Sequence, residues 1–174
     1  SLKQNWLKET FRRIGHLDVN VNPFMASEPW EYRNKVTIPI IERDGKTVLA
    51  FHRAYFPADY IQIEDCVISQ PSLRKLIEKL SSVLQMIHLK LIPFSKRGLG
   101  SRVVLRVIDD RRVVQFFDTE INSTNADILH KLLDEKYADE VISSSGKSLR
   151  QDKKLSSDSE VFLQVNDPVQ EKLY

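Results

Sequence analysis

Cys66 is the single cysteine of this 174-residue chain and the first residue to consider for chemistry. One thiol cannot form an intramolecular disulfide, and it cannot hold a metal ion alone. The histidines lie far apart without an HxxxH spacing, and we interpret them as surface or boundary residues: His16, His52, His88 and His130. Taken by itself, Cys66 is therefore interpreted as a packed, unreactive thiol.

Basic residues crowd one stretch of the chain, in which no acidic residue occurs before Asp109. They are Lys96, Arg97, Arg102, Arg106, Arg111 and Arg112. The net charge of the whole chain is only +2, so overall charge does not indicate a nucleic-acid-binding protein. A cluster of positively charged residues is more often a solvated surface, but such clusters are also typical of proteins that bind the phosphates of nucleic acids.

Several functional classes are excluded by composition. None of the five glycines forms a GxGxxG or GxxxxGK[ST] phosphate loop. Hydrophobic residues make up 41% and charged residues 29%, which is ordinary for a globular protein. No apolar run approaches the roughly 20 residues of a bilayer span, and no signal peptide is recognisable. We expect a soluble, cytoplasmic protein.

The elements that must position these residues begin with a helix from Leu2 to Ile14, which Gly15 is expected to end. Two hairpins are predicted next. The first joins residues 32–41 and 47–51 through the turn at residues 44–45, and the second joins 102–108 and 112–117 through residues 109–110. A further extended piece is expected over residues 60–63.

Two more helices are predicted. Pro71 suits a first helical turn, and an apolar stripe follows it: Leu73, Leu76, Ile77, Leu80, Val83, Leu84 and Ile87. Residues 125–136 predict another helix, with inward-facing Ile128, Leu129, Leu132 and Leu133, and residues 143–159 predict a loop. Two hairpins, each followed by a helix, predict an α+β domain: a mostly antiparallel sheet with helices packed on one face.

Five short segments carry a resemblance to one family. They are residues 3–15, YRNK at 32–35, IEDC at 63–66, VVLRV at 103–107, and FLQVN at 162–166 with QEKLY at 170–174. In this order they resemble the central domain of RNA uridine-C5 methyltransferases, those acting on 23S ribosomal RNA in particular. Each segment alone is weakly specific, whereas five in the family's order are strongly so.

The resemblance implies a fragment of a longer enzyme. Residues 1–158 would be the central RNA-docking domain, and residues 159–174 would begin the domain that binds S-adenosylmethionine. In the family, a cysteine thiolate adds to uracil C6, C5 then attacks the donor methyl group, and a base removes the C5 proton. That cysteine and the glycine-rich donor loop lie beyond residue 174 in the family pattern. The fragment alone is therefore expected to hold no cofactor and to be catalytically inert.

The resemblance also implies roles for single residues. Gln164 matches the glutamine that contacts S-adenosylmethionine, and Phe162 matches the first aromatic of the family's FFQVN motif, whose second Phe is Leu163 here. Cys66 matches the fourth ligand of a [4Fe-4S] cluster in cluster-bearing members. The other three ligands precede the helix that begins this chain, and some members of the family lack the cluster.

The predicted partner is RNA, with no role for DNA or a membrane. Seven basic residues are expected to contact its phosphates: Arg33, Lys35, Arg53, Lys96, Arg97, Arg102 and Arg106. The family commonly has Arg-His before VVLR, where this chain has Ser101-Arg102. A shift of one residue moves a side chain to the other face of a strand. Arg102 therefore cannot be equated with the family's arginine, whereas Arg106 keeps its place.

Three functions remain open at this stage. The parent protein could methylate ribosomal RNA, it could methylate transfer RNA, or the chain could be a free-standing RNA-binding or protein-interaction module without catalysis. Cys66 favours the ribosomal branch, because the transfer-RNA enzymes often lack the cluster. The gene sequence that follows Tyr174 would separate an enzyme from a free-standing module.

Overall fold

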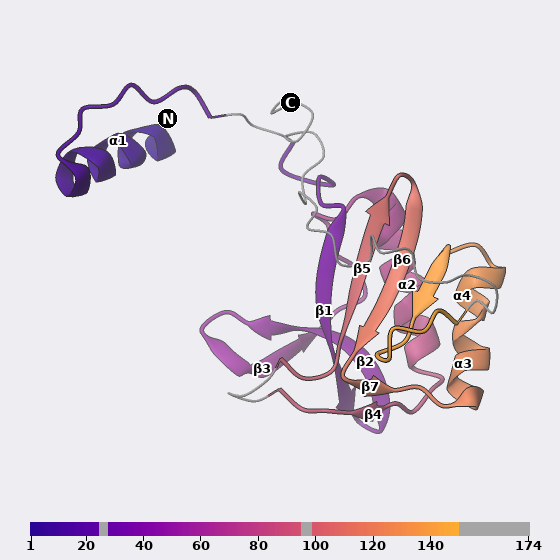
Figure 1. The fold of residues 1–174 in the computed structure, drawn as a ribbon. Coiled ribbons are helices and arrows are strands. Elements are labelled where there is room, and N and C mark those ends of the chain that lie inside the picture. The colour runs from indigo at the N-terminus through magenta and orange to yellow at the C-terminus, as the bar shows by residue number, and fades with distance from the viewer. Residues whose placement is uncertain (25–27, 95–98, 150–174) are drawn as a thin grey trace.

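The structure of the chain is a computed structural model that describes residues 1–24, 28–94 and 99–149 (Figure 1). Four residues with predicted roles lie outside this part: Lys96, Arg97, Phe162 and Gln164. A six-stranded sheet has the strand order β3-β2-β1-β5-β6-β8. Its strands are β1 (Lys35–Arg43), β2 (Lys46–Arg53), β3 (Phe56–Gln62), β5 (Arg102–Ile108), β6 (Arg111–Phe117) and β8 (Glu140–Ile142).

The two predicted hairpins are confirmed as β1–β2 and β5–β6. Asp44 and Gly45 connect the first pair with φ values of 52° and 72°, and Asp109 and Asp110 connect the second with 46° and 63°. Positive φ at both central residues belongs to type I′ turns, whose twist matches that of the flanking strands. β1 then pairs antiparallel with β5, which joins the two hairpins into one sheet.

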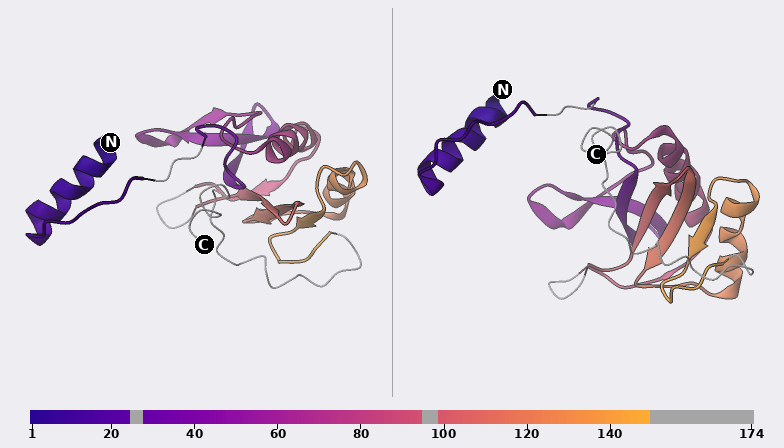
Figure 2. Two further views of the ribbon diagram at one scale, coloured as in Figure 1. Left: turned by 90° about the horizontal axis from the view of Figure 1, so that it is seen from above. Right: turned by 45° about the horizontal axis from the view of Figure 1, so that its top comes forward.

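The core lies between one face of this sheet and α2 (Pro71–Leu84). Every residue of the predicted apolar stripe is buried, including Ile87 beyond the helix end. Alternate residues of β1 contribute from the sheet side: Val36, Ile38 and Ile40. Leu129 and Leu132 from the following helices join the same cluster, so the helices cover one face, as Figure 2 shows. The predicted α+β class is confirmed.

The helix predicted over residues 125–136 is two short helices, α3 (Ser123–Leu129) and α4 (Lys131–Asp134), separated at His130. α3 begins two residues earlier than predicted because the Asn122 side chain caps it, accepting a hydrogen bond of 2.8 Å from the Asn125 backbone N–H. Together they form the crossover to β8, which pairs parallel with β6 and was not predicted. Parallel neighbours need such a connection.

Two smaller elements complete the fold. β4 (Lys90–Leu91) pairs with β7 (Thr119–Glu120) in a separate two-stranded sheet. The loop predicted from residue 143 is confirmed as far as residue 149, and the rest of it lies outside the described residues.

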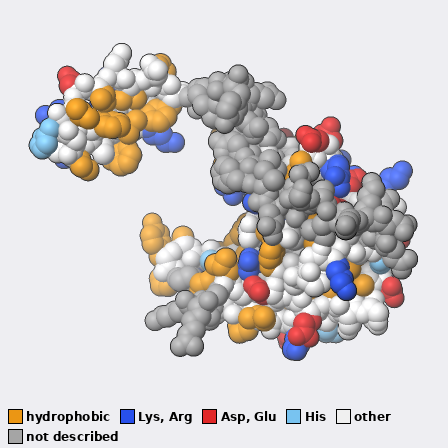
Figure 3. Space-filling model, in the orientation of Figure 1, with side chains coloured by type: hydrophobic (Ala, Val, Ile, Leu, Met, Phe, Trp, Pro, Cys, Tyr) orange, Lys and Arg blue, Asp and Glu red, His pale blue; other side chains and the backbone are white. Residues whose placement is uncertain are grey.

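The first helix, α1 (Leu2–Gly15), ends at Gly15 as predicted, but the left-handed cap residue is His16, with φ of 51°. None of its residues is buried, and it lies apart from the sheet in Figures 1 and 2. Its large apolar side chains Leu2, Trp6 and Ile14 are exposed, and Figure 3 shows hydrophobic side chains gathered on one side of this helix. Of the helices that the structure describes, none combines the length and the apolar character that a membrane span requires.

Candidate functional site

Lys35 and Arg106 are paired across β1 and β5, on the sheet face opposite the helices. Directly opposed residues of an antiparallel pair share one face of the sheet. Arg106 is only 3% exposed, and its Nη2 donates a hydrogen bond to Oε1 of Gln115 on β6. Burial lowers the pKa of the Arg106 guanidinium, against an opposing attraction to the Glu140 carboxylate. A guanidinium remains charged at neutral pH even so.

Arg33 lies just before β1, close to this pair. Its backbone N–H donates to the Ile68 carbonyl at 2.9 Å, and its carbonyl accepts from the Gln70 N–H at 3.0 Å. Its half-buried side chain has an Nε with no hydrogen-bond partner among the described residues, and the same holds for Nε of Arg106. Arg33, Lys35 and Arg106 form no ion pair within the described part of the chain. We call these three residues the cationic end of the sheet.

Two other predicted RNA contacts lie elsewhere and have acidic partners. Arg102, at the opposite end of β5 from Arg106, pairs with Asp118 at 2.6 Å, and its guanidinium lies 4.7 Å from the centre of the Phe117 ring. Arg53 pairs with Asp59 at 2.8 Å across the exposed β2–β3 hairpin. The structure therefore does not bring these arginines to the cationic end, and a phosphate would have to compete with a carboxylate at each.

The end of the basic run also has carboxylate partners. Arg111 pairs with Glu140 at 3.2 Å, and the Arg112 Nε pairs with Asp139 at 3.0 Å. Both acids belong to the region around β8, so these pairs fasten β8 to β6. The acids follow the basic run by at least 27 positions in the sequence, which is why the run seemed uncompensated there.

Cys66 lies half-buried in the loop between β3 and α2, against the edge of the core. Its backbone N–H donates to Asp65 Oδ1 at 2.7 Å, and its carbonyl accepts from the Ser69 N–H at 2.9 Å. Arg74 of α2 holds both Asp65 oxygens, at 2.9 and 2.7 Å, and reaches Glu31 at 2.9 Å. This loop is thus fastened to α2 by a bidentate ion pair.

The residues around Cys66 do not fit a metal cluster by themselves. Within the described ranges, no group of three His, Cys, Asp or Glu side chains could hold a metal ion. A [4Fe-4S] cluster takes four cysteine ligands, and this chain has one cysteine. Cys66 can supply one ligand, and the remainder would have to come from another part of a longer protein.

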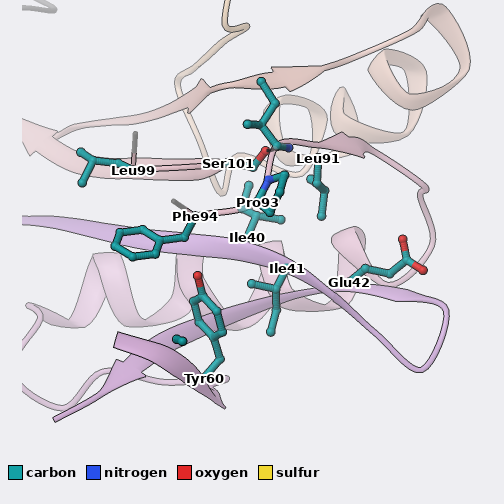
Figure 4. Close-up of a pocket in the computed structure, with 11 residues that line it drawn as sticks. Ile40, Ile41, Glu42, Tyr60, Leu91, Pro93, Phe94, Leu99 and Ser101 are labelled. Atoms are coloured by element: carbon teal, nitrogen blue, oxygen red, sulfur yellow. Dashed lines mark hydrogen bonds between the residues drawn. The ribbon is translucent and has the colours of Figure 1, made fainter. Parts of the chain in front are cut away.

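A pocket of about 450 Å³ was not predicted from the sequence (Figure 4). Strands β1 and β3 form one wall, and residues 91–94 and 99–101 form the other. His52 of β2 supports both walls, because its ring centre lies 4.7 Å from that of Tyr60 and 4.9 Å from that of Phe94. The lining residues come from three separate segments without a shared motif. The one sequence signal was the density of apolar and aromatic residues after Lys90.

Gly100 sets the shape of this pocket wall. Its φ is +68°, and a Cβ atom there would lie 2.6 Å from the Phe94 backbone nitrogen and 2.8 Å from the Ile92 carbonyl oxygen. Such distances are possible only for glycine. Ser101 continues the contact, because its backbone N–H donates to the Ile92 carbonyl and its Oγ accepts from the Ile92 N–H, both at 2.7 Å.

The comparisons with known proteins point to one class of enzyme. No protein family model matches the chain. An 85-residue segment is 35% identical to a protein of Bacillus cereus named an uncharacterized RNA methyltransferase, covering 48% of this chain and 18% of that protein. A 107-residue segment is 29% identical to a protein of the same description from Halalkalibacterium halodurans, covering 60% and 23%. The matched part thus spans about a fifth of these relatives' length.

We expect Asp65→Asn to destabilise the chain modestly at neutral pH. The hydrogen-bonded Arg74 guanidinium lowers the pKa of the Asp65 carboxyl, so the ion pair stabilises the fold above the unfolded-state pKa of about 4. The Asp65 side chain is 44% exposed, which limits the loss to less than about 1 kcal/mol.

The measurement is the free energy of unfolding in urea at several pH values. The difference between wild type and Asp65→Asn should shrink as the pH falls through the lowered native pKa, where the wild-type carboxylate is protonated. Asp127→Asn is the control, because Asp127 is exposed on α3. A difference that stays constant down to acid pH would show that the ion pair does not fasten the Cys66 loop.

Proposed function

We propose that this chain is the RNA-docking part of a longer, S-adenosylmethionine-dependent methyltransferase that methylates C5 of a uridine in ribosomal RNA. The observation that carries the proposal is the 35% identity over 85 residues to a protein named as an RNA methyltransferase. The five family-like segments in the family's order support the uridine-C5 specificity. In this proposal residues 1–158 dock RNA, and residues 159–174 lead into the domain that binds the methyl donor.

The chemistry explains why such an enzyme needs a docking domain. Uracil C5 becomes nucleophilic only after a thiolate has added to C6, so the base must leave its stack and enter a catalytic pocket. Extruding a base costs a few kcal/mol, which contacts between protein and RNA must offset. A domain that holds the RNA on both sides of the extruded base can provide those contacts.

The cationic end of the sheet fits this task. Arg33, Lys35 and Arg106 form no ion pair among the described residues, although the Glu140 carboxylate attracts the buried Arg106 from beyond ion-pair distance. A charge in a poorly solvated position acts more strongly on a nearby phosphate than one in bulk water. Arg106 is the most buried of the three, so an RNA phosphate would reach Arg33 or Lys35 before Arg106.

Gln164 is proposed to contact the methyl donor in the longer protein, because a carboxamide both donates and accepts hydrogen bonds. Phe162 is proposed to lie near the same site. Both residues lie outside the described part of the chain, so the proposal for them depends on the FLQVN segment alone.

Two alternatives differ in substrate or in class. A transfer-RNA methyltransferase would have the same central domain, and a free-standing RNA-binding module would have no catalytic domain. We favour the ribosomal enzyme because of IEDC, and we favour an enzyme over a module because the similar proteins are named methyltransferases.

The longer protein should transfer a methyl group from S-adenosylmethionine to uridine C5 in ribosomal RNA. The 174-residue chain should transfer none, and calorimetry should detect no binding of the donor to it. Incubation with radiolabelled donor, followed by nucleoside analysis of ribosomal and transfer RNA, measures the product. Label in transfer RNA alone would support a transfer-RNA methyltransferase. Micromolar donor binding by the 174-residue chain would contradict the proposal that the donor site belongs mainly to a following domain.

Lys35→Ala should weaken RNA binding and make it less sensitive to salt. Each phosphate that a cation neutralises contributes about one unit to the slope of log affinity against log salt, so this slope should fall by about one. Lys46→Ala is the control, because Lys46 begins β2 beside the end of β1 that is far from Lys35. Arg106→Ala should lower the slope equally if a phosphate reaches it, whereas an unchanged slope would assign Arg106 to the packing of the sheet.

We propose that Cys66 supplies one ligand of a [4Fe-4S] cluster in the longer protein. That protein, purified without oxygen, should be brown and contain about four irons per chain. Cys66→Ser should lower the iron content, because a hydroxyl is a poorer ligand for iron than a thiolate. The measurements are iron content and visible absorbance. If the longer protein is colourless, iron-free and fully active, Cys66 is a packed thiol and not a cluster ligand.

A further inference from the structure

We propose that the pocket between β3 and residues 91–94 and 99–101 binds one unpaired nucleobase of the docked RNA. This inference rests on the proposed RNA-docking function and adds a second contact of a different kind. The cationic end of the sheet acts on phosphates, whereas this pocket is suited to the flat, largely apolar face of a base.

The two aromatic side chains of the pocket provide a stacking surface. Tyr60 extends from β3 toward Phe94 on the opposite wall (Figure 4). Ile41 and Leu91 line the space further along, so a planar ring would meet aromatic or aliphatic atoms on both faces. RNA-binding proteins commonly hold unstacked bases against aromatic side chains in this way. The volume of about 450 Å³ is in the range of small-molecule sites.

Polar groups at the pocket can meet the edge of a base. The Tyr60 hydroxyl and the Glu42 carboxylate both line the pocket, and neither has a hydrogen-bond partner within the described ranges. A hydroxyl donates and accepts, and a carboxylate accepts from ring N–H and exocyclic amino groups. Each of the four bases carries such a donor: uracil its N3–H, guanine its N1–H and amino group, and adenine and cytosine their amino groups.

Backbone contacts fix both walls of the pocket. The close approach of Gly100 to Phe94 and the hydrogen bonds between Ser101 and Ile92 fix one wall, and pairing of β3 with β2 fixes the other. A preformed pocket avoids the cost of ordering its walls when a base enters. A segment of protein could also fill an apolar pocket, but two facing aromatic rings beside a hydroxyl and a carboxylate fit the flat face and the polar edge of a base better.

The test uses the 174-residue chain and a short single-stranded oligoribonucleotide, together with copies that carry one abasic position each. Phe94→Ala should weaken binding of the intact oligonucleotide about tenfold, the effect of one lost stacking contact. Tyr55→Ala should leave the affinity unchanged, because Tyr55 is 97% exposed at the tip of the β2–β3 hairpin and does not line the pocket.

One abasic position should cost the wild type about tenfold and should cost Phe94→Ala almost nothing, because the two changes remove the same contact. Tyr60→Phe keeps the ring and removes the hydroxyl, so it should retain stacking and lose part of the preference among bases. NMR spectra provide a second measurement that needs no variant: the methyl groups of Ile41 and Leu99 should shift when the intact oligonucleotide is added.

The outcomes separate the two proposals. A wild-type chain that binds no RNA would overturn the docking function, and the base pocket with it. A chain that binds RNA with a steep salt dependence, but with Phe94→Ala and every abasic copy behaving like wild type, would overturn the pocket alone. The pocket proposal also fails if the methyl groups of Ile41 and Leu99 in the longer protein already differ from those of the chain and do not respond to RNA, because another segment of protein then fills the pocket.

Discussion

The packing of the α2 stripe against the sheet is the contact on which the other features depend. Leucines and isoleucines on one face of this helix are fully buried against alternate residues of β1, β2, β5 and β6. Each such side chain contributes about 1.5–3 kcal/mol when it leaves water. Because this burial fixes which residues of each strand face the helices, it also fixes the opposite face. Core packing therefore puts Lys35 and Arg106 on that face, and the register between β1 and β5 makes them neighbours.

The distribution of ion pairs then decides where an anion can bind. Arg102, Arg111 and Arg112 belong to the densest basic stretch of the sequence, yet each meets a carboxylate that the fold brings back to it. Of the described residues that were predicted to contact RNA, the three that form no ion pair are Arg33 and Lys35, at the start of β1, and Arg106, toward the end of β5. Contact with an aromatic pocket at one place and with phosphates at another would let the domain hold RNA at two points. Two separated points define an orientation, which a catalytic domain needs if it is to receive one particular base.

The hairpins and α2 could be predicted from the sequence, because a two-residue turn and a helical apolar stripe are both defined by residues that are close together in the chain. β8 has only three residues and pairs with β6 through a crossover, and the two-residue strands β4 and β7 have no periodicity that could reveal them. Of the site residues, Lys35 and Arg106 were predicted one by one, but their pairing depends on the register between β1 and β5. The partners of Arg111 and Arg112 and the pocket around Tyr60 and Phe94 depend on tertiary contacts between distant segments, so sequence patterns could not give them.

Gly100 has a consequence for how this domain can vary among related proteins. A side chain at this position would collide with backbone atoms of Phe94 and Ile92, and backbone cannot move aside as a flexible side chain can. The main-chain path along this wall therefore requires glycine at position 100. Variation of this wall is therefore confined to side chains such as Leu91, Phe94 and Leu99 on a constant backbone. A homologue without glycine at this position would need a wall with a different main-chain path.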